Sequence, residues 1–182
     1  MKNLIKLEQR LIDEEIGSAG KLLDIGCATG ENIIYFSQKC FEVTGFDLSE
    51  EMLKESKEKV EKLGLSIKLV KGNVCDMNMF KDNSFDYVLC MFTLMNLKDE
   101  VLQKQAINEM KRVCKLNGKI FIMVHNSDEG KVIFGDWFDK KFEYRIFNKD
   151  EIKNLIEGIN LKIEKIDIVG EGKYIFSVCS KI

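Results

Sequence analysis

Glycines and acidic residues follow two apolar segments of this chain, where a nucleoside-binding site would need them. Segment 21–25 leads into residues 24–30, which read DIGCATG, and segment 41–46 ends at Asp47. Glycine lets the backbone turn tightly into a helix and approach a ligand closely, and the helix then begins with free N–H groups. An acidic side chain after the second strand of such a unit typically accepts hydrogen bonds from ribose hydroxyls. The alternative, an aspartate that only caps a helix, is weakened because Ser49 is placed as that cap.

The glycine turn differs from the two common phosphate-binding turns. The dinucleotide motif G-x-G-x-x-G would need glycine at position 28 and glycine or alanine at position 31, where this chain has Ala28 and Glu31. A carboxylate at position 31 would repel a pyrophosphate, and no Gly-Lys-Ser/Thr follows as in a P-loop. We therefore expect a ribose-bearing ligand without phosphate at the turn. S-adenosylmethionine fits, because it joins a nucleoside to an amino acid through a positive sulfonium.

Strand-like and helix-like segments alternate along the first two thirds of the chain. Apolar runs with few internal charges predict strands at 21–25, 41–46, 66–70, 85–91, 119–124, 161–169 and 174–180, and apolar periodicity predicts helices at 3–16, 31–38, 49–63, 99–115 and 150–157. Asn117 and Gly118 are expected to form a turn. The pattern predicts an α/β fold, doubly wound and Rossmann-like, with a seven-stranded, mostly parallel sheet, an antiparallel edge hairpin and helices on both faces.

Four segments together resemble the class I S-adenosylmethionine-dependent methyltransferases, in the small single-domain form. Residues 22–30 resemble that family's first motif, D-x-G-x-G-x-G, with Ala28 in the place of the middle glycine. Residues 43–49 resemble the second-strand motif, residues 71–76 followed by 82–86 the adenine-side segment, and residues 108–118 the helix-to-turn segment. The resemblance covers about residues 20–124 and implies the same seven-stranded fold and the same cofactor.

The resemblance also implies roles for individual residues. Asp24 and the backbone of residues 26–30 would hold the methionine portion of the cofactor, Asp47 the ribose, and Leu48 would pack on the adenine. Asn73 stands where the family usually has aspartate, and its amide oxygen can still accept a hydrogen bond from the adenine amino group. The full implied cofactor set is Asp24, Gly26, Cys27, Ala28, Thr29, Gly30, Asn32, Asp47, Leu48, Met52, Asn73, Val74, Cys75, Cys90 and Met91, with Cys90 and Met91 as the floor of the pocket.

The reaction would demand little catalytic machinery, because the cofactor's methyl group is already activated. The main task of the protein would be to align the acceptor, and a base is needed only if the acceptor loses a proton early. His125, the one histidine, follows the fifth predicted strand and is the candidate base, with a structural role as the alternative. Tyr144 is a candidate polar contact for the acceptor, and so is Arg145.

Six aromatic residues gather in residues 126–147, the stretch least similar to the family: Phe134, Trp137, Phe138, Phe142, Tyr144 and Phe147. We interpret this stretch as a candidate substrate lid, with a satellite core or a dimer contact as alternatives. The 182 residues are expected to form one methyltransferase domain. Its parts would be an N-terminal helix (1–20), a cofactor-binding core (21–124), the lid (126–147) and a C-terminal helix and hairpin (148–182).

Composition limits the partners that the chain is expected to have. With 28 Lys and Arg against 30 Asp and Glu, the formal charge is −2, which argues against nucleic acid or an anionic membrane as the main target. No apolar run is long enough for a membrane helix. The six cysteines include no C-x-x-C pair, so we expect no metal site, free thiols and a reducing, cytoplasmic compartment.

The favoured hypothesis is an enzyme that transfers a methyl group from S-adenosylmethionine to a small-molecule acceptor by direct in-line displacement, with S-adenosylhomocysteine as product. One alternative is a methyltransferase that acts on RNA or protein. Another is a non-catalytic partner or regulatory subunit that binds the cofactor. A homodimer is compatible with the sequence, and a nicotinamide-dependent oxidoreductase is excluded by Glu31 and the missing dinucleotide motif.

Overall fold

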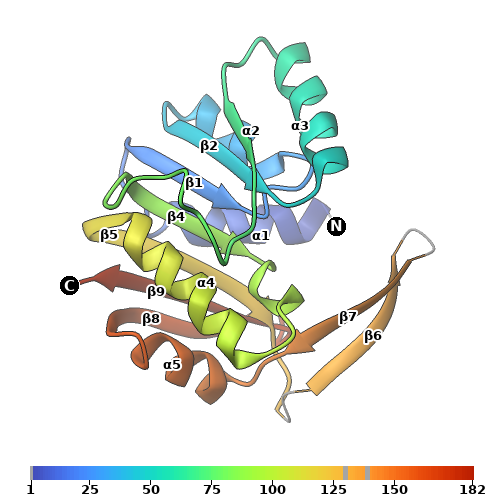
Figure 1. The fold of residues 1–182 in the computed structure, drawn as a ribbon, viewed down its shortest axis with the longest axis vertical. Coiled ribbons are helices and arrows are strands. Elements are labelled where there is room, and N and C mark those ends of the chain that lie inside the picture. The colour runs from blue at the N-terminus through green and yellow to red at the C-terminus, as the bar shows by residue number, and fades with distance from the viewer. Residues whose placement is uncertain (1, 129–130, 138–139) are drawn as a thin grey trace.

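Strands and helices alternate in the computed structural model, which describes residues 2–128, 131–137 and 140–182, with side chains for residues 3–128 and 143–182 (Figure 1). The helices are α1 (Lys2–Asp13), α2 (Glu31–Gln38), α3 (Glu50–Lys62), α4 (Glu100–Val113) and α5 (Lys149–Glu157), with a short 3-10 helix η1 (Leu94–Asn96). The strands are β1 (Lys21–Ile25), β2 (Glu42–Asp47), β3 (Lys68–Lys71), β4 (Phe85–Met91), β5 (Cys114–His125), β6 (Lys131–Trp137), β7 (Lys140–Ile146), β8 (Leu161–Val169) and β9 (Tyr174–Lys181).

The main sheet has seven strands in the order β3-β2-β1-β4-β5-β9-β8. The first five of these are parallel, and β9 pairs antiparallel with both β5 and β8. This confirms the predicted doubly wound sheet with an antiparallel edge hairpin. The chain direction across the sheet reverses between β1 and β4, so the carboxyl ends of these two strands frame the place where open α/β sheets bind ligands.

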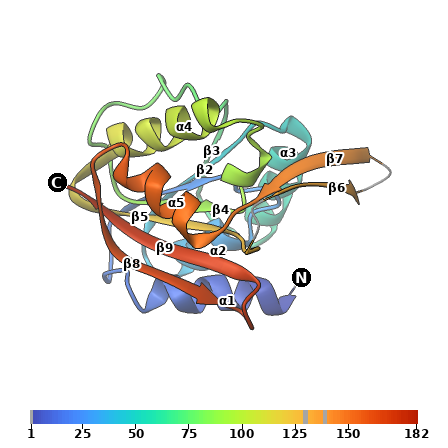
Figure 2. The ribbon, with the colours of Figure 1, turned by 90° about the horizontal axis from the view of Figure 1, so that it is seen from below.

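Two apolar layers cover the two faces of the sheet. One contains side chains of α1, α2 and α3, including Ile12, Phe36 and Val60, and the other contains side chains of α4 and α5. Figure 2 shows α4 and α1 on opposite sides of the sheet. Neighbouring residues of β1 point to opposite layers, since Leu22 belongs to the first and Leu23 to the second. Because both faces are covered, residues 87–91 of β4 and 120–124 of β5 carry no charge.

Capping side chains begin several helices where the sequence predicts. Ser49 Oγ accepts a hydrogen bond from Met52 N–H at 3.3 Å, and Asp99 Oδ1 accepts one from Leu102 N–H at 2.9 Å. Asn148 and Glu151 form a reciprocal capping box at the start of α5. The predicted helix at residues 3–16 is shorter than expected, because α1 ends at Asp13 and the chain continues in a turn.

The turn expected at Asn117 and Gly118 is part of β5. This strand begins at Cys114, pairs with Phe85 there, and resumes pairing with β4 only at Lys119. Asn117 has a φ of 61°, so the extra residues form a bulge within the strand and not a separate connection. The expected turn at Asn117 and Gly118 was therefore wrong, although Asn117 does adopt the left-handed conformation that is common in turns.

Residues 131–137 and 140–146 form two paired strands that the sequence did not indicate. Strands β6 and β7 pair antiparallel as a separate two-stranded sheet, which projects away from the body beside the carboxyl ends of the main strands (Figure 1). Phe138 lies outside the described residues, and the side chains of Phe134, Trp137 and Phe142 lie outside the described side chains. Phe147 is fully buried, as a core residue would be.

Candidate functional site

The glycine turn between β1 and α2 lies at the carboxyl ends of the central strands. Gly26 has a φ of 72° and Gly30 a φ of 92°, both in the left-handed region that favours glycine. Gly26 N–H donates to Phe46 O at 2.7 Å, which fixes the turn to β2. A methyl group at position 26 would overlap with the hydroxyl of Thr93, which donates to Ile25 O at 3.0 Å. The turn therefore needs glycine at position 26 for both conformation and space.

Asp47 is held against the glycine turn by two backbone groups. Its Oδ2 accepts a hydrogen bond from Ala28 N–H at 2.9 Å, and its Oδ1 accepts one from Ser49 N–H at 2.8 Å. Ala28 itself has a φ of 45°, which is unfavourable for a residue with a Cβ atom and costs about 1 kcal/mol. Each carboxylate oxygen keeps a further lone pair for a ligand hydroxyl. Leu48, the next residue, leaves 68% of its surface exposed beside this carboxylate.

Asp24 is a buried carboxylate at the end of β1. Only 2% of its surface is exposed, and no hydrogen bond or ion pair to its carboxylate occurs among the described residues. Burial raises the pKa of Asp24 well above its ordinary value, and the nearby carboxylates of Glu8, Asp47 and Glu31 raise it further. A buried carboxylate without a partner is costly, so this position favours a positively charged ligand group.

Glu8 of α1 is a second buried carboxylate here, and it is not among the site residues expected from the sequence. It is 5% exposed and accepts one hydrogen bond from Asn32 Nδ2 at 3.2 Å. Burial raises the pKa of Glu8 to about 7, with a smaller contribution from Glu31. The signal was present in the sequence, because Glu8 stands between Leu4 and Ile12 at intervals of four, on the apolar stripe of the helix.

We expect Glu8→Gln to stabilise the ligand-free protein at pH 8 by about 1–3 kcal/mol. The pKa of Glu8 is raised to about 7, so the folded state binds a proton more tightly than the unfolded state does. Its contribution to stability is therefore fully present in acid and is lost as the pH rises through 7. Urea unfolding at several pH values measures the difference, which should shrink toward zero near pH 4.5, the ordinary pKa of glutamate. A variant less stable than the wild type at pH 8 would contradict this.

Other predicted cofactor residues of the turn engage their neighbours. Thr29 Oγ1 donates to the carboxylate of Glu31 at 2.8 Å, and Glu31 also pairs with Lys59 at 3.1 Å. Asn32 points toward α1, where its amide contacts Glu8 and Gln9. The side chains of Thr29 and Asn32 thus organise the turn, and they leave its backbone to face a ligand.

The adenine-side residues lie in the loop after β3. Asn73 Oδ1 accepts a hydrogen bond from Cys75 N–H at 2.9 Å, so the amide oxygen that we expected to meet adenine already holds the loop. Val74 and Cys75 are buried. Met52 is half-buried at the start of α3. Gly72 N–H donates to Asp47 O at 3.0 Å, which places this loop next to the ribose-side carboxylate.

Cys90 and Met91, the two residues expected to form the floor of the pocket, lie in different surroundings. Cys90 has no exposed surface and packs with Leu23 and Ile25 in the α4–α5 layer. Burial raises the pKa of its thiol to about 12, so it remains protonated. Met91 is 7% exposed and belongs to the opposite layer. In this structure Cys90 supports the site from within the core and does not line it.

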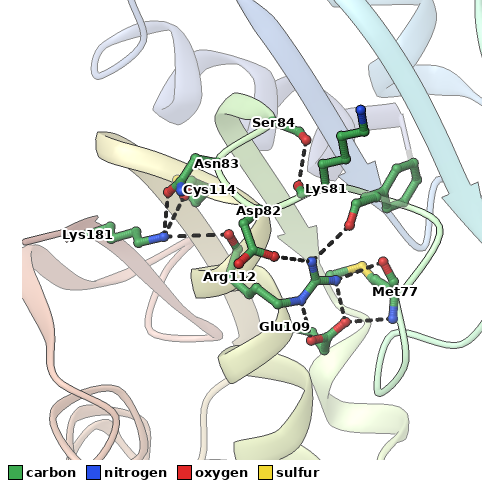
Figure 3. Close-up of polar contacts among 10 residues, drawn as sticks. Met77, Lys81, Asp82, Asn83, Ser84, Glu109, Arg112, Cys114 and Lys181 are labelled. Atoms are coloured by element: carbon green, nitrogen blue, oxygen red, sulfur yellow. Dashed lines mark hydrogen bonds and ion pairs between the residues drawn. The ribbon is translucent and has the colours of Figure 1, made fainter.

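Arg112 of α4 fastens the far end of the adenine-side loop, as Figure 3 shows. Its guanidinium donates to Met77 O and Phe80 O, both at 2.8 Å. It also pairs with Glu109 through two nitrogens, at 2.7 and 2.8 Å, and with Asp82 at 2.8 Å. Glu109 in turn accepts a hydrogen bond from Met77 N–H at 2.7 Å. The network ties the loop of residues 77–82 to α4.

Four half-buried rings gather beyond the ends of β4 and β5. His125 lies 5.2 Å from Phe92, 5.2 Å from Tyr174 and 6.1 Å from Tyr144, measured between ring centroids. Burial lowers the pKa of His125, so its imidazole is neutral at neutral pH. The structure thus brings the two predicted acceptor-side residues together, and it adds two rings that the sequence did not indicate. Arg145 is committed elsewhere, to an ion pair with Glu151 at 2.7 Å.

Residues 23–122 match a family model described as a methyltransferase domain, and they make up more than half of the chain. The chain belongs to this methyltransferase family. The methyltransferase domain so defined includes the glycine turn, Asp24, Asp47 and the adenine-side loop, and it excludes Glu8, His125 and Tyr144. No helix among the described residues is long and apolar enough to cross a membrane.

Known proteins resemble this methyltransferase in sequence and fold. Demethylmenaquinone methyltransferase of Staphylococcus aureus (strain JH9) is 33% identical over 154 residues, which are 79% of this chain and 61% of that protein. The PH0226 protein from Pyrococcus horikoshii OT3 has a TM-score of 0.86 at 21% identity. The alignment covers all of this chain and 91% of that one. Burkholderia thailandensis 1,6-didemethyltoxoflavin-N1-methyltransferase, crystallised with bound 1,6-didemethyltoxoflavin and S-adenosylhomocysteine, has a TM-score of 0.81 at 18% identity, over 97% of this chain and 77% of that one.

Proposed function

We propose that this protein transfers a methyl group from S-adenosylmethionine to a small-molecule acceptor by direct in-line displacement, with S-adenosylhomocysteine as product. The family supports the reaction class, and the named relatives support a small acceptor. The chain spans 61% of the length of the curated relative, which is less than two thirds. The proposed activity and acceptor therefore depend on the residues of the site and not on this relative alone.

The charge of the site is the observation that carries the proposal. The glycine turn is surrounded by the carboxylates of Asp24, Glu31 and Asp47, and only Glu31 has a cationic partner among the described side chains. An anionic dinucleotide would be repelled here, whereas a nucleoside with a positive ammonium and a positive sulfonium would be attracted. The residues present therefore fit S-adenosylmethionine.

Each part of the turn has a binding role in this proposal. The carboxylate of Asp47, oriented by two backbone N–H groups, would accept hydrogen bonds from the ribose hydroxyls. Asp24 would attract the ammonium group, and exposed Leu48 would pack on the adenine. When bound, S-adenosylmethionine supplies an already activated methyl group. The remaining work of the chain is to hold the acceptor in line with it and to exclude water.

The four rings around His125 are the proposed acceptor side. Half-buried aromatic side chains at the carboxyl ends of β4 and β5 favour a flat, ring-bearing acceptor, because ring faces stack with one another. The acceptors named for two relatives, demethylmenaquinone and 1,6-didemethyltoxoflavin, agree with this choice. Neutral His125 is placed to take a proton if the acceptor releases one. Hairpin β6–β7 would wall this side.

Calorimetric titration with S-adenosylhomocysteine tests the cofactor, with NAD as the control ligand. We expect a dissociation constant of about 1–100 μM for S-adenosylhomocysteine and no binding of NAD, because the turn repels a pyrophosphate. Transfer of labelled methyl to a set of hydroxylated quinols and heteroaromatic compounds then tests the acceptor. Binding of NAD alone would overturn the proposal. Binding of S-adenosylhomocysteine without transfer to any acceptor, flat or not, would favour a non-catalytic cofactor-binding protein.

A further inference from the structure

Helix α1 lies outside the family-matched residues and nevertheless contributes a carboxylate to the site. Glu8 is 5% exposed, and its only hydrogen bond among the described residues comes from Asn32 Nδ2 at 3.2 Å. Asn32 lies in the first turn of α2, directly after the glycine turn. This contact joins Glu8 to the residues that directly follow the glycine turn.

The charged groups next to Glu8 and Asp24 are mainly acidic. Glu31 of α2 raises the pKa of Glu8, and Glu8, Asp47 and Glu31 raise the pKa of Asp24. Lys59 of α3 is a cation that contacts Glu31. Lys59 is already paired with Glu31 at 3.1 Å and with Glu55 at 3.2 Å. The carboxylate of Asp47 accepts hydrogen bonds from two backbone N–H groups. Glu8 and Asp24 are left as two buried carboxylates with no cation between them among the described residues.

Asp24 is the independent sign that a ligand belongs here. It is 2% exposed, and no donor or cation among the described residues contacts its carboxylate. A purely structural role for Glu8 would not require a charge. The amide oxygen of a glutamine could accept the same hydrogen bond from Asn32 without the cost of a second buried anion. The carboxylate is therefore explained better by a cation that arrives from outside.

We propose that Glu8 is a positioning residue for the cofactor, the second carboxylate, with Asp24, of a subsite for the ammonium group of S-adenosylmethionine. This inference rests on the proposed function and adds to it a contribution from the N-terminal helix. The ammonium brings the positive charge that the pair lacks, and α1 becomes the wall of the subsite. Glu8 acts through the field it shares with Asp24 and through Asn32, and it has no role in the transfer step.

The subsite makes cofactor affinity depend on pH. Before the ligand binds, burial holds the pKa of Glu8 at about 7, so part of the population carries a proton near neutrality. A bound ammonium favours the carboxylate and lowers this pKa, so binding expels the proton. Affinity therefore rises as the pH rises toward 7 and levels off above it. With one group of this pKa, the affinity changes by about tenfold between pH 6 and pH 7.5.

Calorimetry with two ligands and three proteins tests the proposal. S-adenosylhomocysteine carries the ammonium, and 5′-methylthioadenosine has the same nucleoside and sulfur without the amino acid. The proteins are the wild type, Glu8→Gln and the matched control Glu14→Gln, which removes an exposed carboxylate just beyond the same helix. Titrations at about pH 6 and pH 7.5, in buffers of different ionisation enthalpy, give both the affinity and the number of protons released.

We expect the wild type and Glu14→Gln to bind S-adenosylhomocysteine about tenfold more tightly at pH 7.5 than at pH 6, with release of a proton. Glu8→Gln should bind it about tenfold more weakly at pH 7.5, with a smaller pH dependence and fewer protons released than the wild type, because only Asp24 still titrates there. Binding of 5′-methylthioadenosine should be equal in all three proteins. Equal affinities of wild type and Glu8→Gln for S-adenosylhomocysteine at both pH values would overturn the proposal for Glu8 alone. Failure of the wild type to bind either ligand would overturn the proposed function instead.

Glu8→Asp separates charge from shape. It keeps the carboxylate on a side chain one methylene shorter, so it should recover part of the affinity and the pH dependence if charge is what matters. A glutamine that binds as well as glutamate, with an aspartate that binds worse, would instead assign Glu8 a packing role and overturn the proposal.

Discussion

Asp47→Ala is expected to weaken the binding of S-adenosylhomocysteine by a hundredfold or more. The carboxylate is held by Ala28 N–H at 2.9 Å and Ser49 N–H at 2.8 Å, and in the proposed complex it would also accept hydrogen bonds from two ribose hydroxyls. Hydrogen bonds to a charged group contribute about 1.5–3 kcal/mol each, and 1.4 kcal/mol corresponds to a factor of ten in affinity. Calorimetry or a competition assay with labelled cofactor measures the loss.

The control for Asp47→Ala is Asp86→Ala at the opposite end of the sheet. Asp86 also accepts a hydrogen bond from a backbone N–H, that of Lys21 at 2.9 Å, and it pairs with Lys115 at 2.7 Å. Its removal should lower stability without changing affinity, because it lies at the amino end of β1. If Asp47→Ala retained wild-type affinity, or if both variants lost affinity equally, Asp47 would not be the ribose ligand.

Arg112→Met is expected to destabilise the fold by about 3 kcal/mol. The substitution removes both nitrogens that pair with Glu109, together with the donors to Met77 O and Phe80 O (Figure 3). It leaves a half-buried carboxylate and two carbonyl groups to find other partners. Urea unfolding measures the loss of stability. Because the same loop carries Asn73, cofactor affinity should fall as well, by severalfold.

The exposed arginine of α1 is the control for Arg112→Met. Arg10 pairs with Glu14 at 4.0 Å in solvent, so Arg10→Met should change stability by about 0.5 kcal/mol or less. Arg112 holds the pKa of Glu109 below its usual range. The pair therefore stabilises the protein at neutral pH and loses this effect as the pH falls through that lowered pKa. A gap between wild type and Arg112→Met that is as large in acid as at neutrality would argue against the ion pair as its cause.

The sequence was a good guide where contacts are local or periodic. Strand β1 and helix α2 begin and end at the predicted residues, and Ser49 caps α3 as expected. Asp47 reaches the turn because β1 and β2 are adjacent parallel strands, an arrangement that the strand–helix–strand order already implies. Hairpin β6–β7 was missed, since its aromatic residues were interpreted as a lid and not as paired strands.

The sequence by itself therefore determined the fold class, the strand–helix order and the carboxylates around the glycine turn, because these follow from periodicity and from motifs within a single strand–turn–helix unit. Only the tertiary structure decided which distant side chains join them. The rotation of α1 places Glu8 toward the turn, α4 directs Arg112 into the adenine-side loop, and separate strands bring His125 and Tyr144 together. These long-range contacts depend on how helices and strands pack across the sheet, and no local pattern in the sequence specifies that packing.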